Sequence, residues 1–195
     1  MNKIAIIVLA AGKGTRMKSD LPKVMHRAAG RSLLGHVLHA ARELAPSEAV
    51  VVVGPDMDTV WAESRAVFPS ARRAVQADRL GTAHAVSMAR PELAGFTGTV
   101  LVLYGDVPLI SADSLKRLAG LAANGMAVLG FEAEDPHGYG RLLQDAEGGV
   151  VAIREELDAS PAERAVRLCN SGIIAIDAAL LWKLLPRIGN ANAKG

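Results

Sequence analysis

Aromatic residues and cysteine are scarce in this chain, and their scarcity argues against several classes of function. Phe, Trp and Tyr make up only 4% of the sequence, so stacking platforms for single-stranded nucleic acid are not expected. The formal net charge is +2 and no basic tract is present, which argues against a general DNA-binding protein. The single cysteine, Cys169, cannot form an internal disulfide, so a reducing compartment is the simpler assumption. We therefore expect a cytoplasmic protein without a nucleic-acid partner.

Long apolar segments are absent as well. No run approaches the roughly 20 apolar residues of a membrane span, so no membrane partner is expected. The apolar segment near the N-terminus is similar to a short signal peptide, but cleavage after Ala11 would destroy the strongest motif of the chain, so export is not expected. With 195 residues, 50% of them hydrophobic, the chain suits one α/β domain that buries a sizeable core.

The strongest motif is a strand that runs into a small, basic loop. The apolar run over residues 4–8 predicts a buried parallel strand, and it continues into Leu9-Ala10-Ala11-Gly12-Lys13-Gly14-Thr15-Arg16-Met17, closed by Leu21-Pro22-Lys23. Ligands bind at the carboxyl ends of strands in α/β sheets. Small residues let backbone N–H groups approach a ligand, and the cations of this loop favour a polyphosphate. The loop has neither the Gly-Lys-Ser/Thr of a Walker A motif nor the third glycine of a dinucleotide fingerprint, so an ATPase and an NAD-binding protein are both unsupported.

Two further segments place polar groups after predicted strands. Gln76 ends a short strand, and Thr82 is the expected N-cap of the alanine-rich helix that follows; read alone, this is a capped surface helix, with His84 as an inward-facing packing residue. Asp106 ends an uninterrupted apolar strand, where its carboxylate can bring Mg²⁺ to phosphates, although an Asp in a turn is more often a cap.

The rest of the chain alternates helical and strand patterns. In the helix expected after Ile110, the apolar stripe comprises Leu115, Leu118, Leu121 and Ala122. Helices are expected over residues 32–44, 60–67, 111–124 and around 180–185, and strands over residues 49–53, 99–103 and 126–131.

Together these motifs resemble the sugar-nucleotide pyrophosphorylases, and most closely the N-terminal domain of the bacterial N-acetylglucosamine-1-phosphate uridyltransferases. The resemblance covers nearly all of the chain and is carried by the glycine-containing loop with its Pro-Lys pair, by the Gln-x(4)-Gly-Thr segment at 76–82 and by Tyr-Gly-Asp-Val-Pro-Leu at 104–109. Weaker matches are Tyr-Gly-Arg at 139–141, Ile-x-Glu at 153–155 and Asn-Ser-Gly at 170–172. Leu157 departs from the pattern, since many members carry lysine there.

The resemblance implies a three-layer α/β/α Rossmann-like nucleotidyltransferase fold, with a mostly parallel mixed sheet and a small β insertion that forms the sugar pocket. Residues 1–110 would form the nucleotide-binding half and residues 111–195 the sugar-binding half. The domain would be incomplete at its C-terminus, without the Asn that supplies a second metal contact and without the β-helix acetyltransferase domain. For the full-length protein the resemblance implies a homotrimer built mainly by that β-helix, and it leaves open whether the fragment is a monomer.

The activity implied is Mg²⁺-dependent: UTP and N-acetylglucosamine 1-phosphate give UDP-N-acetylglucosamine, a cell-wall precursor, and pyrophosphate. Two alternatives stay open, namely another sugar-1-phosphate nucleotidyltransferase that uses dTTP, CTP or GTP, and a catalytically impaired fragment that only binds a UDP-sugar.

The resemblance also implies roles for individual residues. Arg16 would meet the leaving pyrophosphate, Lys23 the α-phosphate region, and Asp106 the Mg²⁺ ion. The implied nucleotide and sugar contacts are Leu9, Ala10, Ala11 and Gly12 of the loop, Gln76, Gly81 and Thr82 at the uracil, Tyr104 and Gly105 along the sugar nucleotide, and Gly140, Glu155 and Asn170 at the sugar.

Overall fold

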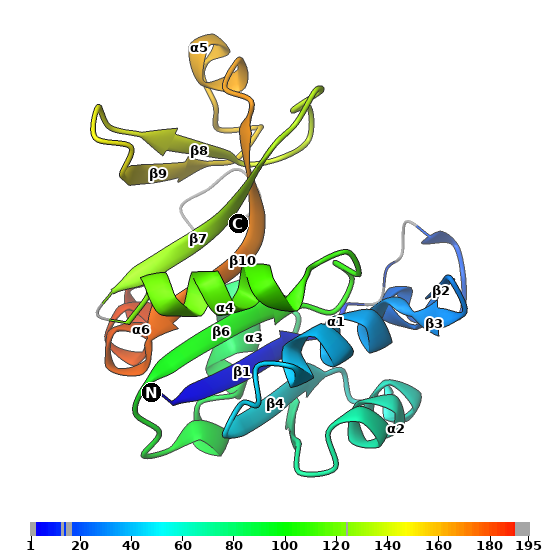
Figure 1. Cartoon of the computed structure of the whole chain (residues 1–195). Coiled ribbons are helices and arrows are strands. Elements are labelled where there is room, and N and C mark those ends of the chain that lie inside the picture. The colour runs from blue at the N-terminus through cyan, green and yellow to red at the C-terminus, as the bar shows by residue number, and fades with distance from the viewer. Residues whose placement is uncertain (1–2, 13, 15–16, 124, 190–195) are drawn as a thin grey trace. The chain divides into compact units, whose positions relative to one another are not determined.

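The chain folds into two compact units, and the strands β7 (Met126–Glu132) and β10 (Leu168–Asp177) each belong partly to both (Figure 1). The computed structural model describes residues 3–12, 14, 17–123 and 125–189. Unit 1 comprises Met1–Ala127 and Ile174–Arg187, and unit 2 comprises Val128–Ile173 and Ile188–Gly195. The chain therefore leaves unit 1, builds unit 2 and returns to unit 1 along one strand.

The centre of unit 1 is a mixed sheet in the order β5-β4-β1-β6-β10. The first four strands are parallel, and the C-terminal part of β10 is antiparallel to β6. In the register, Ile7 lies opposite Val50 on one side and opposite Val102 on the other. The strands are β1 (Ile4–Leu9), β4 (Glu48–Val53), β5 (Arg72–Val75), β6 (Thr99–Tyr104) and β10 (Leu168–Asp177).

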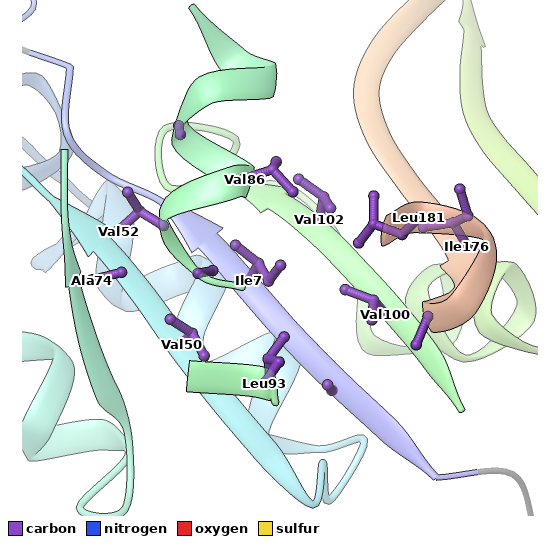
Figure 2. Close-up of a cluster of buried hydrophobic side chains, with 14 of the residues drawn as sticks. Ile7, Val50, Val52, Ala74, Val86, Leu93, Val100, Val102, Ile176 and Leu181 are labelled. Carbon is purple, nitrogen blue, oxygen red and sulfur yellow. The ribbon is translucent and has the colours of Figure 1, made fainter. Parts of the chain in front are cut away.

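The central strands are continuous apolar runs because helices cover both faces of the sheet. Side chains alternate between the faces, so Ile7 joins the core shown in Figure 2, whereas its neighbour Ile6 faces the other layer. Both side chains are fully buried, and burying a side chain of this size contributes about 1.5–3 kcal/mol. The core of Figure 2 lies under α3 (Thr82–Met88) and α6 (Ala178–Leu184).

The opposite face is covered by α1 (Leu33–Arg42) and α4 (Ala112–Leu121), and α2 (Asp58–Val67) packs against α1 (Figure 1). Both covering helices begin at a serine that caps them, since the hydroxyl of Ser32 accepts from the Gly35 amide at 2.8 Å and that of Ser111 from the Ser114 amide at 3.1 Å. The short elements of this unit are β2 (Arg27–Ala28), β3 (Arg31–Ser32) and the 3₁₀ helices η2 (Lys23–Met25), η3 (Pro91–Leu93) and η4 (Leu185–Arg187).

Unit 2 is a small β insertion. Its hairpin pairs Leu142 with Ile153, and Cys169 of the N-terminal part of β10 pairs with Arg141. Burial raises the pKa of the Cys169 thiol, which suits an inert strand residue rather than a nucleophile. The elements are β7 (Met126–Glu132), β8 (Arg141–Gln144), β9 (Val150–Arg154) and α5 (Pro161–Arg164).

The predicted strands and helices are present, with two local corrections. Gly81, not Thr82, is the N-cap of α3, and no side chain caps that helix. Leu121 was expected in the apolar stripe of α4 but is 76% exposed, because at 100° per residue it lies about 120° away from Leu115. That helix ends at Leu121, and the expected end at Asn124 lies outside the described residues. Within the described ranges, no helix is long and apolar enough to cross a membrane.

Candidate functional site

A pocket of about 260 Å³ lies in unit 1 where the parallel strands end. The loops after β1, β5 and β6 reach it because parallel strands bring their carboxyl ends to one edge of the sheet. Three segments that are far apart in the sequence therefore meet around one cavity. Its lining consists of Leu9, Ala11, Gly12, Gly14, Lys23, Val24, Gln76, Arg79, Gly81, Thr82, Ala85, Tyr104 and Asp106.

The loop after β1 is held close to the sheet. The amide of Ala10 donates to the carbonyl of Val52 at 2.8 Å, so the loop begins in a fixed position, with Ala10 buried behind the lining. Gly14 has φ of +65°, and a Cβ at this position would lie 2.5 Å from the Cβ of Lys23. Glycine is therefore required here for two reasons: the positive φ is strained for other residues, and a Cβ would clash with Lys23. Arg16, like Lys13 and Thr15, lies outside the described residues.

Lys23 and Asp106 form an ion pair inside this pocket. The ammonium nitrogen of Lys23 lies 2.7 Å from Oδ2 of Asp106, with 44% and 27% of the two side chains exposed. Gly105 lies behind the lining, where its amide donates to the carbonyl of Leu9 at 3.0 Å. The loops after β1 and β6 are thus joined by both a backbone hydrogen bond and an ion pair.

The donor set fits a metal that is shared with phosphates. Asp106 is the one carboxylate among the described lining residues, and the described ranges contain no group of three or more His, Cys, Asp or Glu side chains that would hold a metal alone. Mg²⁺ is commonly bound by one or two carboxylates, substrate phosphates and water. A single aspartate beside the predicted phosphate loop therefore suits Mg²⁺ that arrives with a nucleotide.

The other end of the pocket is built around Gln76, which is only 4% exposed. Its amide nitrogen lies 3.1 Å from the carbonyl oxygen of Gly81 and 3.2 Å from Nδ1 of His84. The hydroxyl of Tyr104 donates to that of Thr82 at 3.2 Å. His84 was expected to be a packing residue, but it also makes a polar contact with the residue that is predicted to read the base.

Arg79 is a lining residue that the sequence did not indicate. Its Nε–H donates to the carbonyl of Ala11 at 2.8 Å, and its guanidinium lies against Gly54, where a Cβ would meet Nη2 at 2.7 Å. Arg79 therefore joins the segment after β5 to the loop after β1. The signal that was available is its position between Gln76 and Gly81, inside the segment predicted to read the base.

The predicted sugar residues lie together in unit 2. The amide of Asn170 donates to the carbonyl of Gly140 at 2.8 Å, and the Asn170 side-chain oxygen accepts from the amide of Gly172 at 2.9 Å. A Cβ at Gly140 would lie 3.0 Å from Oε1 of Glu155, so a larger residue would crowd this carboxylate. Three segments that are distant in sequence therefore converge within this unit.

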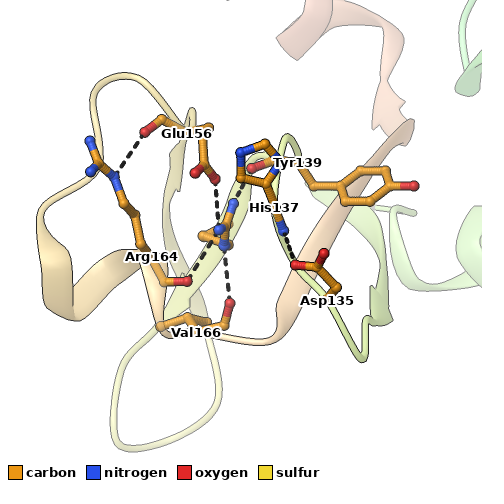
Figure 3. Close-up of polar contacts among 7 residues, drawn as sticks. Asp135, His137, Tyr139, Glu156, Arg164 and Val166 are labelled. Atoms are coloured by element: carbon orange, nitrogen blue, oxygen red, sulfur yellow. Dashed lines mark hydrogen bonds and ion pairs between the residues drawn. The ribbon is translucent and has the colours of Figure 1, made fainter.

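Arg141, the last residue of the Tyr-Gly-Arg segment, is only 1% exposed and has a structural role in unit 2. Its guanidinium pairs with the Glu156 carboxylate at 2.7 Å and donates to the carbonyls of Val166 and Arg164, both at 3.1 Å, and of Tyr139. Figure 3 shows these acceptors, which come from the segment before β8, the segment between β9 and α5, the end of α5 and the segment before β10. The arginine thus joins the loops that carry the predicted sugar residues.

Comparisons with known proteins agree with this architecture. A model of the MobA-like NTP transferase domain matches residues 6–146. The bifunctional protein GlmU of Rhodospirillum rubrum is 52% identical over 199 residues, covering 100% of this chain and 44% of the relative. GlmU of Azorhizobium caulinodans is 52% identical over 194 residues, covering 98% and 43%. The chain thus spans less than half the length of these curated relatives.

A solved structure extends the comparison to the fold. A Bacillus anthracis protein described as a glucose-1-phosphate thymidylyltransferase superposes with a TM-score of 0.75 at 17% identity, covering 96% of this chain and 76% of that one. At such low identity the likeness shows the fold alone, and it confirms the predicted α/β Rossmann-like fold. The resemblance to the bacterial uridyltransferases is confirmed as well, because the relatives with about half of their residues identical are GlmU proteins.

The pair of Arg141 and Glu156 predicts a pH-dependent stability. The hydrogen bond from Arg141 lowers the pKa of the Glu156 carboxyl below its ordinary value. A depressed folded-state pKa means that the stabilisation is fully present above the unfolded pKa and is lost as the pH falls through the folded pKa. We expect Glu156→Gln to lower the free energy of unfolding at about pH 7, and the difference from wild type to shrink towards about pH 3.

Urea titrations of both proteins at several pH values measure this difference. Glu147→Gln, in the exposed turn between β8 and β9, is the matched control and should stay close to wild type throughout. A Glu156→Gln deficit that is the same at both pH values would contradict the assigned ion pair.

Proposed function

Because the chain belongs to the family of MobA-like NTP transferase domains, we propose that it transfers a uridylyl group from UTP to N-acetyl-α-D-glucosamine 1-phosphate, giving UDP-N-acetylglucosamine and pyrophosphate. The observation that carries the proposal is that one pocket is lined by Gly12 and Gly14 of the predicted phosphate loop, by Asp106 and by Gln76. The chain that holds this pocket is about half identical to GlmU proteins. The proposal concerns nucleotidyl transfer only, because the chain spans less than half of those relatives. The product is a nucleotide sugar that serves as a cell-wall precursor.

The chemistry requires little proton transfer. A phosphate monoester has a second pKa of about 6, so the sugar phosphate is largely a dianion at pH 7 and is already a nucleophile. One of its oxygens bonds to the α-phosphorus of UTP, the bond from that phosphorus to the bridging oxygen breaks, and pyrophosphate leaves with the electron pair. Repulsion between the anions opposes this step, so catalysis depends on positioning and on neutralising charge.

The basic side chains near the loop supply that charge. We assign Lys23 to the α-phosphate region; in support, its ammonium lies in the pocket beside Asp106. We assign Arg16, which lies outside the described residues, to the leaving pyrophosphate by its place in the motif. The backbone from Leu9 to Gly12 would hold the nucleotide and ribose, since its small residues allow close approach.

Membership of this family implies dependence on a divalent metal, and we propose Mg²⁺ held by Asp106. When bound, the ion would neutralise phosphate charge. Lys23 pairs with the same carboxylate, and the assigned α-phosphate would give its ammonium a second anionic partner when the nucleotide binds.

The two uncharged ends of the substrate, the uracil and the sugar, would be recognised by hydrogen bonds. Gln76, Gly81 and Thr82 are assigned to the uracil, with Tyr104 and Gly105 along the sugar nucleotide. In unit 2, Glu155 and the Asn170 side chain suit the hydroxyl and acyl groups of N-acetylglucosamine, because a carboxylate accepts from hydroxyl groups and an amide both accepts and donates.

A panel of nucleoside triphosphates and sugar 1-phosphates tests the proposal. We expect pyrophosphate release to be fastest with UTP and N-acetylglucosamine 1-phosphate, with kcat/KM about 10²-fold above CTP or GTP, since a site that hydrogen-bonds a base edge rejects mismatched edges strongly. Preference for another nucleotide would replace the uridylyl assignment. Binding of UDP-N-acetylglucosamine in calorimetry without any pyrophosphate release would identify a binding fragment instead of an enzyme.

Asp106→Asn tests the metal assignment. Losing a preorganised electrostatic contact typically costs about 10²- to 10³-fold in rate, so we expect kcat/KM to fall by this amount and the Mg²⁺ concentration for half activity to rise. Asp113→Asn, which changes an exposed carboxylate on α4 that pairs only loosely with Lys116 at 3.9 Å, is the control. An unchanged Mg²⁺ titration in Asp106→Asn would refute the ligand role.

A further inference from the structure

The side-chain amide of Gln76 is held in one orientation. It follows β5, where its backbone amide donates to the carbonyl of Val53 at 2.9 Å, and its side chain is almost fully buried. Its amide nitrogen lies within hydrogen-bond distance of two atoms, the carbonyl oxygen of Gly81 and Nδ1 of His84. The two contacts use both hydrogens of the amide group.

Chemistry fixes which end of the amide faces Gly81. A backbone carbonyl oxygen only accepts hydrogen bonds, so the group 3.1 Å from it must be the NH₂ end of Gln76 and not its oxygen. The same carbonyl also accepts from the amide of Ala85 at 3.1 Å, in the first turn of α3. The Gly81 carbonyl that accepts from the Gln76 amide is therefore fixed by the first turn of α3 and does not rotate freely.

The tautomer of His84 follows from this orientation. Because the NH₂ group of Gln76 can only donate, Nδ1 of His84 must accept, and the ring proton lies on Nε2. If Nδ1 carried the proton instead, it would oppose the amide hydrogens and favour a rotated Gln76. His84 thus adds to Gly81 a second constraint on the same amide.

The remaining hydrogen-bonding atom of this side chain is the acceptor Oε1. Uracil presents a donor at N3–H between its two carbonyl oxygens, whereas N3 of cytosine is an acceptor. If Oε1 of Gln76 faces N3 of the base, it can accept from the N3–H of uracil. With cytosine, the lone pairs of Oε1 and of N3 would face each other instead. Unpaired or opposed polar groups in a buried site weaken binding strongly.

We propose that His84 is a positioning residue for nucleobase selection: by accepting from Gln76, it holds Oε1 towards the ligand and makes the pocket select a pyrimidine with a proton on N3. The inference deepens the proposed uridylyl transfer and rests on it. It also predicts that the pair of Gln76 and His84 does not discriminate between thymidine and uridine nucleotides, because both bases carry a proton on N3.

The test compares base selectivity in His84 variants. We expect His84→Ala to lower the ratio of kcat/KM for UTP over CTP by about tenfold, the equivalent of one lost hydrogen bond. His84→Asn should keep the ratio within about threefold of wild type, because its side-chain oxygen lies close to the position of Nδ1 and also accepts. His39→Ala, on α1 outside this pocket, is the control and should leave the ratio unchanged.

A packing role would give a different pattern. If His84→Ala lowers kcat/KM for UTP and CTP equally, or if His84→Asn loses selectivity as fully as His84→Ala does, the positioning role is overturned. A wild-type protein that neither binds UDP-N-acetylglucosamine nor releases pyrophosphate from UTP overturns the proposed function instead, so the two failures are distinguishable.

A second measurement uses the wild-type protein, so it requires neither a variant that folds correctly nor enzymatic activity. In ¹⁵N NMR spectra of the wild-type imidazole, we expect His84 with its proton on Nε2 and an unprotonated Nδ1 that accepts a hydrogen bond. A proton on Nδ1 in the neutral ring would overturn the proposal.

Discussion

Three backbone hydrogen bonds beyond the ends of the strands hold the pocket together. Ala10 donates to Val52, Gly105 to Leu9 and Gln76 to Val53, at 2.8, 3.0 and 2.9 Å. Each bond extends the pairing of neighbouring parallel strands by one step, so the first residue of each functional loop is placed by the sheet itself. The buried register of β1 between β4 and β6 is what makes these bonds possible. Side-chain links from Lys23 to Asp106 and from Arg79 to Ala11 then connect loops that are already in position.

In unit 2, the loops are held together by a buried cation, the guanidinium of Arg141. Arg141 binds one carboxylate and several backbone carbonyls from separate segments, which gives irregular loops a common partner. Such a group is costly to bury unless it is fully paired, and here the pairing also fixes the segments beside Gly140 and Glu155. Among the described residues of unit 2, the buried apolar side chains are Ala133, Leu142, Ala159, Cys169 and Ile173, so Arg141 adds polar links to a small apolar set.

Much of this was readable from the sequence, because the signals were local. The apolar runs predicted β1, β4 and β6, and the spacing of small and basic residues predicted the phosphate loop between Leu9 and Lys23. The roles of Arg79, Arg141 and His84 were not predictable in the same way, since each depends on a partner 68, 15 or 8 residues away in the chain. Thr82 illustrates the limit for caps: its residue type suits an N-cap, yet Gly81 takes that position with φ of +96°.

The central claim is that the pocket at the carboxyl ends of β1, β5 and β6 binds a uridine nucleotide. Amide chemical-shift mapping of the ¹⁵N-labelled chain during titration with UDP-N-acetylglucosamine tests it most directly. In unit 1, the largest shifts should fall on Ala11, Gly12, Gln76, Gly81 and Thr82, and an equal titration with CDP should leave them nearly unchanged. Shifts of unit 1 that cluster away from this pocket, or equal responses to both nucleotides, would contradict the account.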